Sequence, residues 1–169
     1  VPLGSSVLVS GNVFDNNSAL DNGGCMKVDG FNGQLFQNEF LGCSAGTYGG
    51  AVHLAATNGL TLFYNNVVNA CSADSGAALW VTSAEPQVVN NTFFDNTALD
   101  VNVGAVLRLF AGSYQNNIVA FGTGYGVRFS SSCCSIFAHN NVFGTSLANY
   151  YSADQTGLAN NVSVDPGFS

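Results

Sequence analysis

Asparagine recurs through the chain at nearly regular intervals, and this spacing limits the folds open to the chain more than any other feature. Successive marker asparagines are 20 to 28 residues apart, and in five of the seven units a second asparagine directly precedes the marker. The markers are Asn12, Asn38, Asn66, Asn91, Asn117, Asn141 and Asn161. Self-similarity at such a period is typical of a solenoid, in which each unit buries its apolar face against its neighbours.

Two further patterns keep the same period. An apolar residue follows the marker by two positions in six units, at Phe14, Phe40, Val68, Phe93, Val119 and Phe143. A glycine opens a short alternating segment in Gly24-Cys25-Met26, Gly50-Ala51-Val52, Gly76-Ala77-Ala78, Gly104-Ala105-Val106 and Gly126-Val127. Alternation indicates strands, asparagine tolerates left-handed corners, and its amide can bond to the asparagine one coil away. The sequence therefore predicts an all-β parallel β-helix of about seven coils, each with three short strands, with asparagine ladders at the corners and a stacked Phe/Val core.

Composition narrows the range of partners. Lys and Arg number three against ten Asp and Glu, a net charge of −7, whereas nucleic acids and anionic membranes require broad basic surfaces. No run of 18 apolar residues exists, so we expect no membrane insertion of this segment. We expect a single domain over residues 1–169 without a cofactor. Because residue 1 is not Met and no leader is visible, we expect a mature or excised piece that continues into flanking domains of a larger protein.

The five cysteines allow two interpretations. Cys43 and Cys71 occupy the same position in adjacent units, and stacked rungs lie ~4.8 Å apart, within the range of a disulfide. A Cys43–Cys71 bridge or two small thiols at equivalent turns fit equally well. Cys25 takes an alanine position and should face inward, and the adjacent Cys133 and Cys134 have no partner that the pattern identifies. The absence of C-x-x-C spacing argues against zinc.

The repeat motifs also suggest a family. Gly-Gly-Ala-Val together with Phe-x-x-Asn (Phe14 to Asn17, Phe93 to Asn96) resembles the repeats of polymorphic outer-membrane proteins, which are autotransporter passengers and surface adhesins. More broadly, the chain is similar to right-handed parallel β-helix repeat proteins, which include pectate-lyase-like and polygalacturonase-like enzymes. The resemblance implies a right-handed β-helix in an extracellular or cell-surface location. The chain departs from the Phe-x-x-Asn motif where Cys43 and Cys71 replace its asparagine.

One set of residues exceeds what the repeat requires. Each glycine-opened segment contains an outward residue between two inward apolar ones, since side chains alternate across a strand. These outward positions hold all three Lys and Arg residues of the chain, its only Trp and one of its two His: Lys27, His53, Trp80, Arg108 and Arg128. We call these five residues the cationic stripe. It should form a ladder about 19 Å long, four rungs of ~4.8 Å.

The stripe suits an extended ligand that lies parallel to the solenoid axis. Trp80 would stack on a sugar face. Lys27, Arg108 and Arg128 would pair with carboxylates or sulfates, the arginines through their planar forks. Asp21, Asp74 and Asp100, in the loops before these strands, would rim the site, which favours a neutral or mildly acidic glycan. The interpretation that we favour is a non-catalytic adhesin rod or a glycan- or partner-binding module.

Two alternatives remain at this point. A polysaccharide lyase needs a base and an acid, and Lys27 and His53, one rung apart, are the candidates for these roles. A polygalacturonase-like hydrolase would need several Asp side chains on the glycine-opened strands, and the outward positions of the stripe contain none. The second alternative is a filament subunit that associates end to end, because uncapped solenoid ends expose sheet edges.

Overall fold

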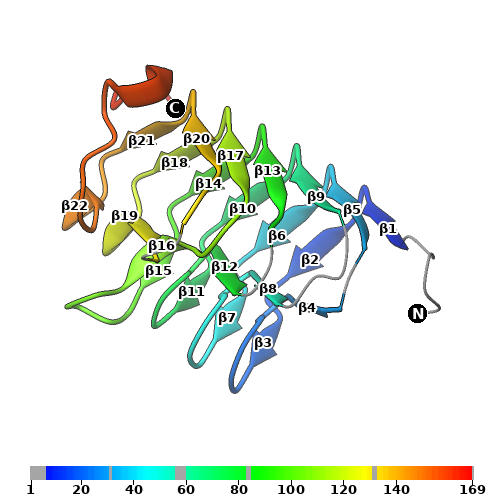
Figure 1. The fold of residues 1–169 in the computed structure, drawn as a ribbon. Helices are drawn as coiled ribbons and strands as arrows, with labels where there is room; N and C mark the ends of the chain where they lie inside the picture. The colour runs from blue at the N-terminus through cyan, green and yellow to red at the C-terminus, as the bar shows by residue number, and fades with distance from the viewer. Residues whose placement is uncertain (1–6, 31, 56–59, 83–84, 131–132, 169) are drawn as a thin grey trace.

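The chain folds into four parallel sheets wound into a solenoid (Figure 1). The computed structural model describes residues 7–30, 32–55, 60–82, 85–130 and 133–168. Coils follow one another from the blue N-terminal end to the orange C-terminal end, so each strand pairs with the equivalent strand of the next coil. The predicted all-β parallel solenoid is therefore confirmed.

Three of the sheets have six strands each and one has four. The first sheet comprises β1 (Val7–Ser10), β5 (Gly33–Phe36), β9 (Thr61–Tyr64), β13 (Gln87–Val89), β17 (Ser113–Gln115) and β20 (Ile136–Ala138). The second comprises β2 (Val13–Asp15), β6 (Glu39–Leu41), β10 (Val67–Asn69), β14 (Thr92–Phe94), β18 (Ile118–Ala120) and β21 (Asn141–Phe143). The third comprises β3 (Ser18–Ala19), β7 (Ser44–Ala45), β11 (Ser72–Ala73) and β15 (Thr97–Ala98). The fourth comprises β4 (Met26–Asp29), β8 (Val52–Ala55), β12 (Leu79–Thr82), β16 (Ala105–Leu109), β19 (Tyr125–Phe129) and β22 (Ala148–Tyr150).

The coil count and the strands per coil differ from the prediction. The solenoid makes about 5 turns rather than seven. The last asparagine unit, at Asn161, follows β22, the last described strand, and begins no further coil. The first four coils contain four strands rather than three. The additional strand is only two residues long, as in β11 (Ser72–Ala73), and such a strand is too short to show alternation in the sequence. The 3₁₀ helix η1 (Leu158–Asn160) follows the last coil. Among the described residues no helix is long and apolar enough to cross a membrane.

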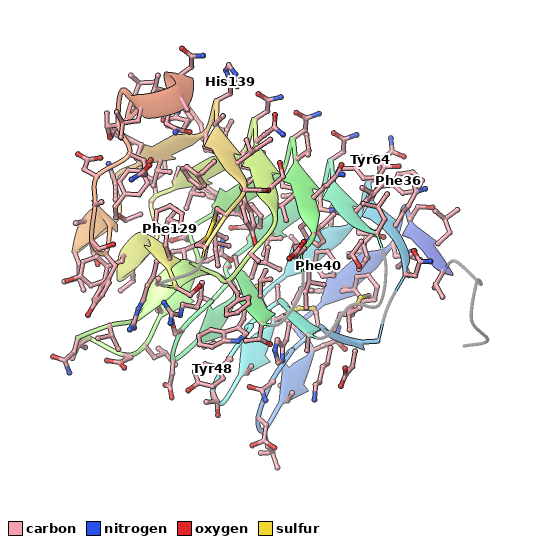
Figure 2. All side chains as sticks on the ribbon, in the orientation of Figure 1. Phe36, Phe40, Tyr48, Tyr64, Phe129 and His139 are labelled. Atoms are coloured by element: carbon pink, nitrogen blue, oxygen red, sulfur yellow. A yellow bond between two sulfur atoms is a disulfide. The ribbon has the colours of Figure 1, made fainter. Side chains whose placement is uncertain are left out.

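The core is the predicted stack of Phe and Val along the second sheet. Phe14, Phe40, Val68, Phe93 and Val119 are consecutive Cα partners in register. Phe14 and Phe40 stack with ring centroids 4.9 Å apart, and Phe40 is fully buried inside the coil (Figure 2). Gly50 is required next to this core, because a Cβ there would collide with the carbonyl oxygens of Ser72 and Ala77.

A continuous asparagine ladder joins the coils where the first and second sheets meet. In each step, the side-chain Nδ2 donates to Oδ1 of the next asparagine at 3.0–3.1 Å, and the backbone N–H donates to the same oxygen. The ladder is formed by Asn12, Asn38, Asn66, Asn91, Asn117, Asn140 and Asn161. The predicted marker in the sixth unit, Asn141, is wrong by one residue. His139, with φ 57°, takes the left-handed corner that Asn65, Asn90 and Asn116 hold in the preceding units, and Asn141 begins β21.

Cysteine supplies a second, shorter ladder where the second and third sheets meet. The Cys43 N–H donates to Cys71 Sγ at 3.3 Å, and the Cys71 N–H donates to Asn96 Oδ1 at 2.9 Å. Asn96 in turn donates from Nδ2 to the Val68 carbonyl at 2.9 Å. Cys71 thus replaces the asparagine of the Phe-x-x-Asn motif in the hydrogen-bonding role as well as in the sequence.

The disulfides differ from the expected Cys43–Cys71 pair. Cys43 is joined to Cys25, with Cα atoms 5.5 Å apart, because Cys25 occupies the inward alanine position beside it. Cys71 is a buried free thiol, and burial raises its pKa to about 11. The adjacent Cys133 and Cys134 are joined to each other.

Candidate functional site

The fourth sheet brings the five residues of the cationic stripe into one ladder. Their Cα partners run in unbroken order from Lys27 to His53, Trp80, Arg108 and Arg128. The inward neighbours of each are apolar, and all but Met26 and Phe129 are buried. Strand alternation therefore directs the five side chains away from the core, as the sequence predicts.

His53 belongs to the ladder but is withdrawn from the surface. The side chain is only 7% exposed, and its Nε2 lies 2.9 Å from Thr82 Oγ1 on the next strand. Burial lowers the pKa of His53, and the neighbouring Lys27 lowers it further, while Asp29 acts in the opposite direction. His53 is thus packed between rungs in surroundings that disfavour its charged form, and its Nδ1 is buried with no hydrogen-bond partner among the described residues. The expected contact between His53 and a ligand therefore has little support in this geometry.

Trp80 carries an aromatic partner that the stripe pattern does not include. Tyr48 lies against the indole with ring centroids 3.9 Å apart and an interplanar angle of 18°. Tyr48 comes from the preceding coil and lies at the lower outer edge of the solenoid in Figure 2, 37% exposed. Because Tyr48 covers one face of Trp80, that face is not available to a sugar, and Tyr48 becomes part of the candidate surface.

Arg108 and Arg128 are held across the boundary between their two coils. Arg108 Nη1 donates to the Phe129 carbonyl at 3.2 Å, in the coil of Arg128. Arg128 Nη1 donates to the Val103 carbonyl at 2.8 Å, in the coil of Arg108. Burial lowers the pKa of Arg108, and the charge of Arg128 contributes in the same direction. Both guanidinium groups are half-buried, and each is fixed by a neutral carbonyl of the neighbouring coil rather than by a carboxylate.

Aromatic rings flank both arginines. The Arg108 guanidinium carbon lies 5.6 Å from the centroid of Trp80, and that of Arg128 lies 4.3 Å from the centroid of Tyr151. Both distances fall within the range of cation–π attraction. Tyr151 follows β22, whose register places Tyr150 opposite Val127, and its edge packs against Tyr125 with centroids 5.0 Å apart. The ladder thus continues by one aromatic rung beyond its predicted end.

Two of the aspartates expected to rim the site, Asp21 and Asp100, lie close to residues of the stripe. Asp21 and Lys27 line one shallow pocket of about 380 Å³ together with Ala19, Leu20 and Asn22. At the other end of the stripe, Asp100 Oδ1 accepts hydrogen bonds from the N–H groups of Asn102 and Val103, in the loop whose carbonyl holds Arg128. Asp74 lies between these ends, and its carbonyl accepts from the Asp100 N–H at 3.1 Å. No carboxylate forms an ion pair with Lys27, Arg108 or Arg128 within the described ranges.

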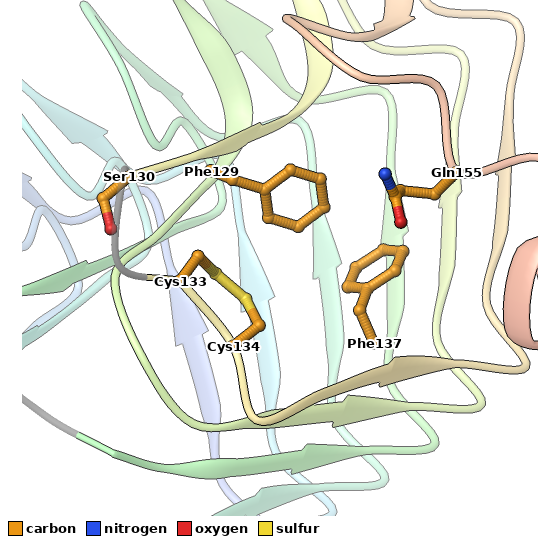
Figure 3. A pocket seen from close by; sticks show the side chains of 6 residues that line it. All are labelled: Phe129, Ser130, Cys133, Cys134, Phe137 and Gln155. Carbon is orange, nitrogen blue, oxygen red and sulfur yellow. A yellow bond between two sulfur atoms is a disulfide. The ribbon is translucent and has the colours of Figure 1, made fainter.

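A second pocket, of about 320 Å³, lies in the last coil and is lined by Phe129, Ser130, Cys133, Cys134, Phe137 and Gln155 (Figure 3). Phe129 and Phe137 meet edge to face there, with centroids 5.0 Å apart. Figure 3 shows the Cys133–Cys134 disulfide on one side of these rings and Gln155 on the other. None of the described residues that line this pocket is charged, and its rings belong to the end of the core.

The sequence pattern missed Tyr48 and Tyr151 as members of the surface. A signal for Tyr48 exists in the repeat, since Asn22, Tyr48 and Ser75 are bridge partners directly before the glycine segments. Tyr151 lies within a segment, Leu147 to Thr156, that reads as an insertion, although its residues Ala148–Tyr150 form β22. Only the pairing with β19 places Tyr151 beside Arg128.

The parts of the chain that the structure describes contain no group of three His, Cys, Asp or Glu side chains arranged to hold a metal ion. Fold and surface together define the chain as a parallel β-solenoid with an aromatic and cationic ladder on one sheet. Comparisons with protein-family models, with curated proteins and with solved structures find no match.

Proposed function

We propose that the chain is a non-catalytic binding module that contacts a glycan along the fourth sheet. The observation that carries the proposal is the unbroken register that runs from Lys27 through His53 to Trp80, Arg108 and Arg128. The two arginines have no carboxylate partner in the described structure. Unpaired guanidinium groups beside exposed aromatic rings suit a ligand that has both sugar rings and acidic groups.

The ligand that fits is extended and only sparsely acidic. A ladder with one side chain per ~4.8 Å rung matches a linear chain that lies parallel to the solenoid axis. The net charge of −7 and the rim formed by Asp21 and Asp100 would repel a dense polyanion. A mainly neutral glycan with occasional carboxylate or sulfate groups meets both conditions.

We place this module in an extracellular or cell-surface protein of the adhesin type. The resemblance of its Gly-Gly-Ala-Val and Phe-x-x-Asn motifs to polymorphic outer-membrane protein repeats supports this assignment. The two disulfides support it as well, since such bonds persist mainly in oxidising compartments.

The lyase alternative has weaker support. A proton-transfer residue must reach the substrate within hydrogen-bond distance. His53 is buried, and Thr82 already contacts its Nε2. Lys27 is exposed. His53, its partner on the next strand, would have to leave its packed position before the two could act together as base and acid.

The filament alternative keeps one supporting observation. The first coil exposes apolar side chains, with Leu8 63%, Val13 62% and Leu20 95% accessible. A second solenoid end or a flanking coil would cover them. Fibres that lengthen with protein concentration, seen by electron microscopy, would favour self-association, and their absence would leave the binding module as the leading proposal.

Glycan-array binding tests the main proposal. The native chain is compared with the double variant Trp80→Ala/Arg108→Ala and with a matched control, Gln34→Ala/Tyr64→Ala. The control pair lies outward on the first sheet, where Tyr64 stacks on Phe36 and donates to Gln34 at 2.9 Å (Figure 2). We expect binding by the native chain and the control and its loss in the stripe variant. Equal binding by all three, or binding by none, would refute the proposal.

A further inference from the structure

Arg108 and Arg128 are Cα partners on neighbouring strands, and each is hydrogen-bonded to the coil of the other. Each donates from Nη1 to a carbonyl in the other's coil, at 3.2 and 2.8 Å. This fixes both guanidinium groups near the boundary between two rungs. Each group retains donors that the described contacts do not use, because a guanidinium has five N–H bonds.

The two positive charges lack a local anion. Like charges in a half-buried position destabilise each other more than charges in bulk water do. Neither Arg108 nor Arg128 forms an ion pair within the residues that the structure describes. The carbonyls of Phe129 and Val103 orient the guanidinium groups but carry no net charge with which to neutralise them. An added oxyanion between the groups would relieve the repulsion and engage the remaining donors.

The surroundings exclude free rotation of either side chain. Arg108 lies over Trp80 at 5.6 Å and Arg128 over Tyr151 at 4.3 Å. Trp80 is itself held by Tyr48, and Tyr151 by Tyr125. An anion site formed from side chains that are already ordered costs less conformational entropy on binding than one formed from mobile side chains.

We propose that Arg108 and Arg128 form a two-guanidinium clamp for one oxyanion group, a carboxylate or a sulfate ester, on an otherwise neutral glycan. The clamp rests on the proposed glycan-binding function and specifies the ligand further. One acidic group would lie at Arg108 and Arg128, and the adjoining sugar would lie beside the aromatic surface of Tyr48 and Trp80. The acidic loop at Asp100, whose Oδ1 accepts from the Val103 N–H, disfavours a second anion close by.

The composition of the chain makes the clamp directly observable. Arg108 and Arg128 are its only arginines, so a ¹⁵N–¹H spectrum of the arginine Nε groups contains two side-chain signals. The probes are glucuronate and glucose 6-sulfate, each measured against glucose, with sodium chloride at matched ionic strength as the screening control. The two acidic probes distinguish a carboxylate source from a sulfate source of the same chemistry.

We expect both Nε signals to shift together and saturably with at least one acidic probe, and neither to shift with glucose or chloride. Arg108→Lys and Arg128→Lys keep the charge but remove the planar fork, and each should weaken binding of the acidic probe by about tenfold or more. A melting temperature within a few degrees of the native value, as expected for a surface substitution, would show that each variant is folded.

The outcomes separate the clamp from the proposed function. Silent Nε signals, or a shift of only one of them, overturn the clamp even if the glycan array is positive. Paired shifts with the acidic probe support the clamp even if the array is negative, in which case it is the glycan-binding proposal that fails. Lysine variants that bind as tightly as the native chain also overturn the clamp, since a bidentate fork would then be unnecessary.

Discussion

Tyr48 lies face to face with Trp80, with the ring centroids 3.9 Å apart. The two residues come from adjacent coils and from different repeat positions, so the contact depends on the stacking of the solenoid. It turns the single tryptophan of the chain from an isolated outward ring into part of a composite aromatic surface. Arg108 approaches the same indole from the following coil. The surface that we propose for glycan binding is therefore ordered before any ligand arrives.

The Tyr48→Ala variant tests this aromatic pair. Loss of the stacked ring should lower the free energy of unfolding by about 1 kcal/mol beyond the loss of buried area, and water should reach the uncovered face of Trp80. We expect a red shift of Trp80 fluorescence in the folded variant. Tyr64→Ala is the control, because Tyr64 stacks on Phe36 on the first sheet in the same way, with centroids 4.9 Å apart. A red shift in both variants, or in neither, would contradict the contact.

The asparagine ladder should account for a large share of the stability of each coil. Asn66 is 1% exposed, and its Oδ1 accepts from both the N–H and Nδ2 of Asn38, while its own Nδ2 donates to Leu35 O and Asn91 Oδ1. Asn66→Ala leaves several buried polar groups without partners, at ~1–3 kcal/mol each. We expect a loss of about 3 kcal/mol or more in urea unfolding.

The adjacent asparagine provides the matched control for this ladder experiment. Asn65 is exposed and adopts φ 55° at the corner, a conformation that glycine also tolerates. Asn65→Gly should therefore change the free energy of unfolding by no more than about 0.5 kcal/mol. Similar losses at positions 65 and 66 would show that the corner conformation, and not the ladder, stabilises the coil.

Much of this fold could be predicted because the same pattern of corner and inward residues recurs in each unit of the repeat. A single Asn pair would suggest only a turn, but seven near-equivalent units fix the period, the corners and the inward residues Phe40, Val68 and Phe93. The prediction failed where the repeat is least regular. In the sixth unit, His139 takes the left-handed corner and shifts the ladder residue to Asn140, an exchange that residue type alone does not reveal.

Cys71→Asn should complete the second ladder. Asn96 shows the required contacts, accepting from the Cys71 N–H and donating to the Val68 carbonyl, and Val68 is the register partner of Phe40. An asparagine at position 71 would accept from the Cys43 N–H and donate to Phe40 O in place of a weaker thiol bond. We expect stability equal to the native chain or about 1 kcal/mol higher, and a loss of about 2 kcal/mol for Cys71→Ala. Urea unfolding would measure both, and an asparagine variant less stable than the alanine variant would refute this account.

The buried imidazole of His53 should make stability depend on pH. Its pKa in the folded chain lies below the ordinary value of 6.5, chiefly through burial and then through Lys27. The unfolded chain therefore binds the proton more readily, so this contribution is complete above about pH 6.5 and is lost as the pH falls through the folded pKa. Comparison with His53→Gln at pH 7.5 and 5.0 cancels the titration of other groups. We expect the native chain to lose more stability than the variant on acidification, and equal losses would contradict the assignment.

The candidate site was less predictable than the fold. Strand alternation places Lys27, Trp80, Arg108 and Arg128 on one line, because every second residue of a strand points away from the core. Strand alternation gives the direction of a side chain but not what covers it. The burial of His53, which is 7% exposed, is therefore not predictable from the sequence. Tyr48 and Tyr151 reach the surface through contacts between coils, and these depend on the register of loops that the repeat does not constrain.

Titration of an array-positive glycan, followed through the fluorescence of Trp80, tests the central proposal most directly, since the chain has no other tryptophan. The proposal predicts a saturable change in emission for the native chain and for Gln34→Ala/Tyr64→Ala, with affinity reduced about tenfold or more in Arg108→Ala. A glycan that binds the native chain by calorimetry while Trp80 emission stays constant and Arg108→Ala binds equally well would place the binding surface elsewhere and contradict the proposal.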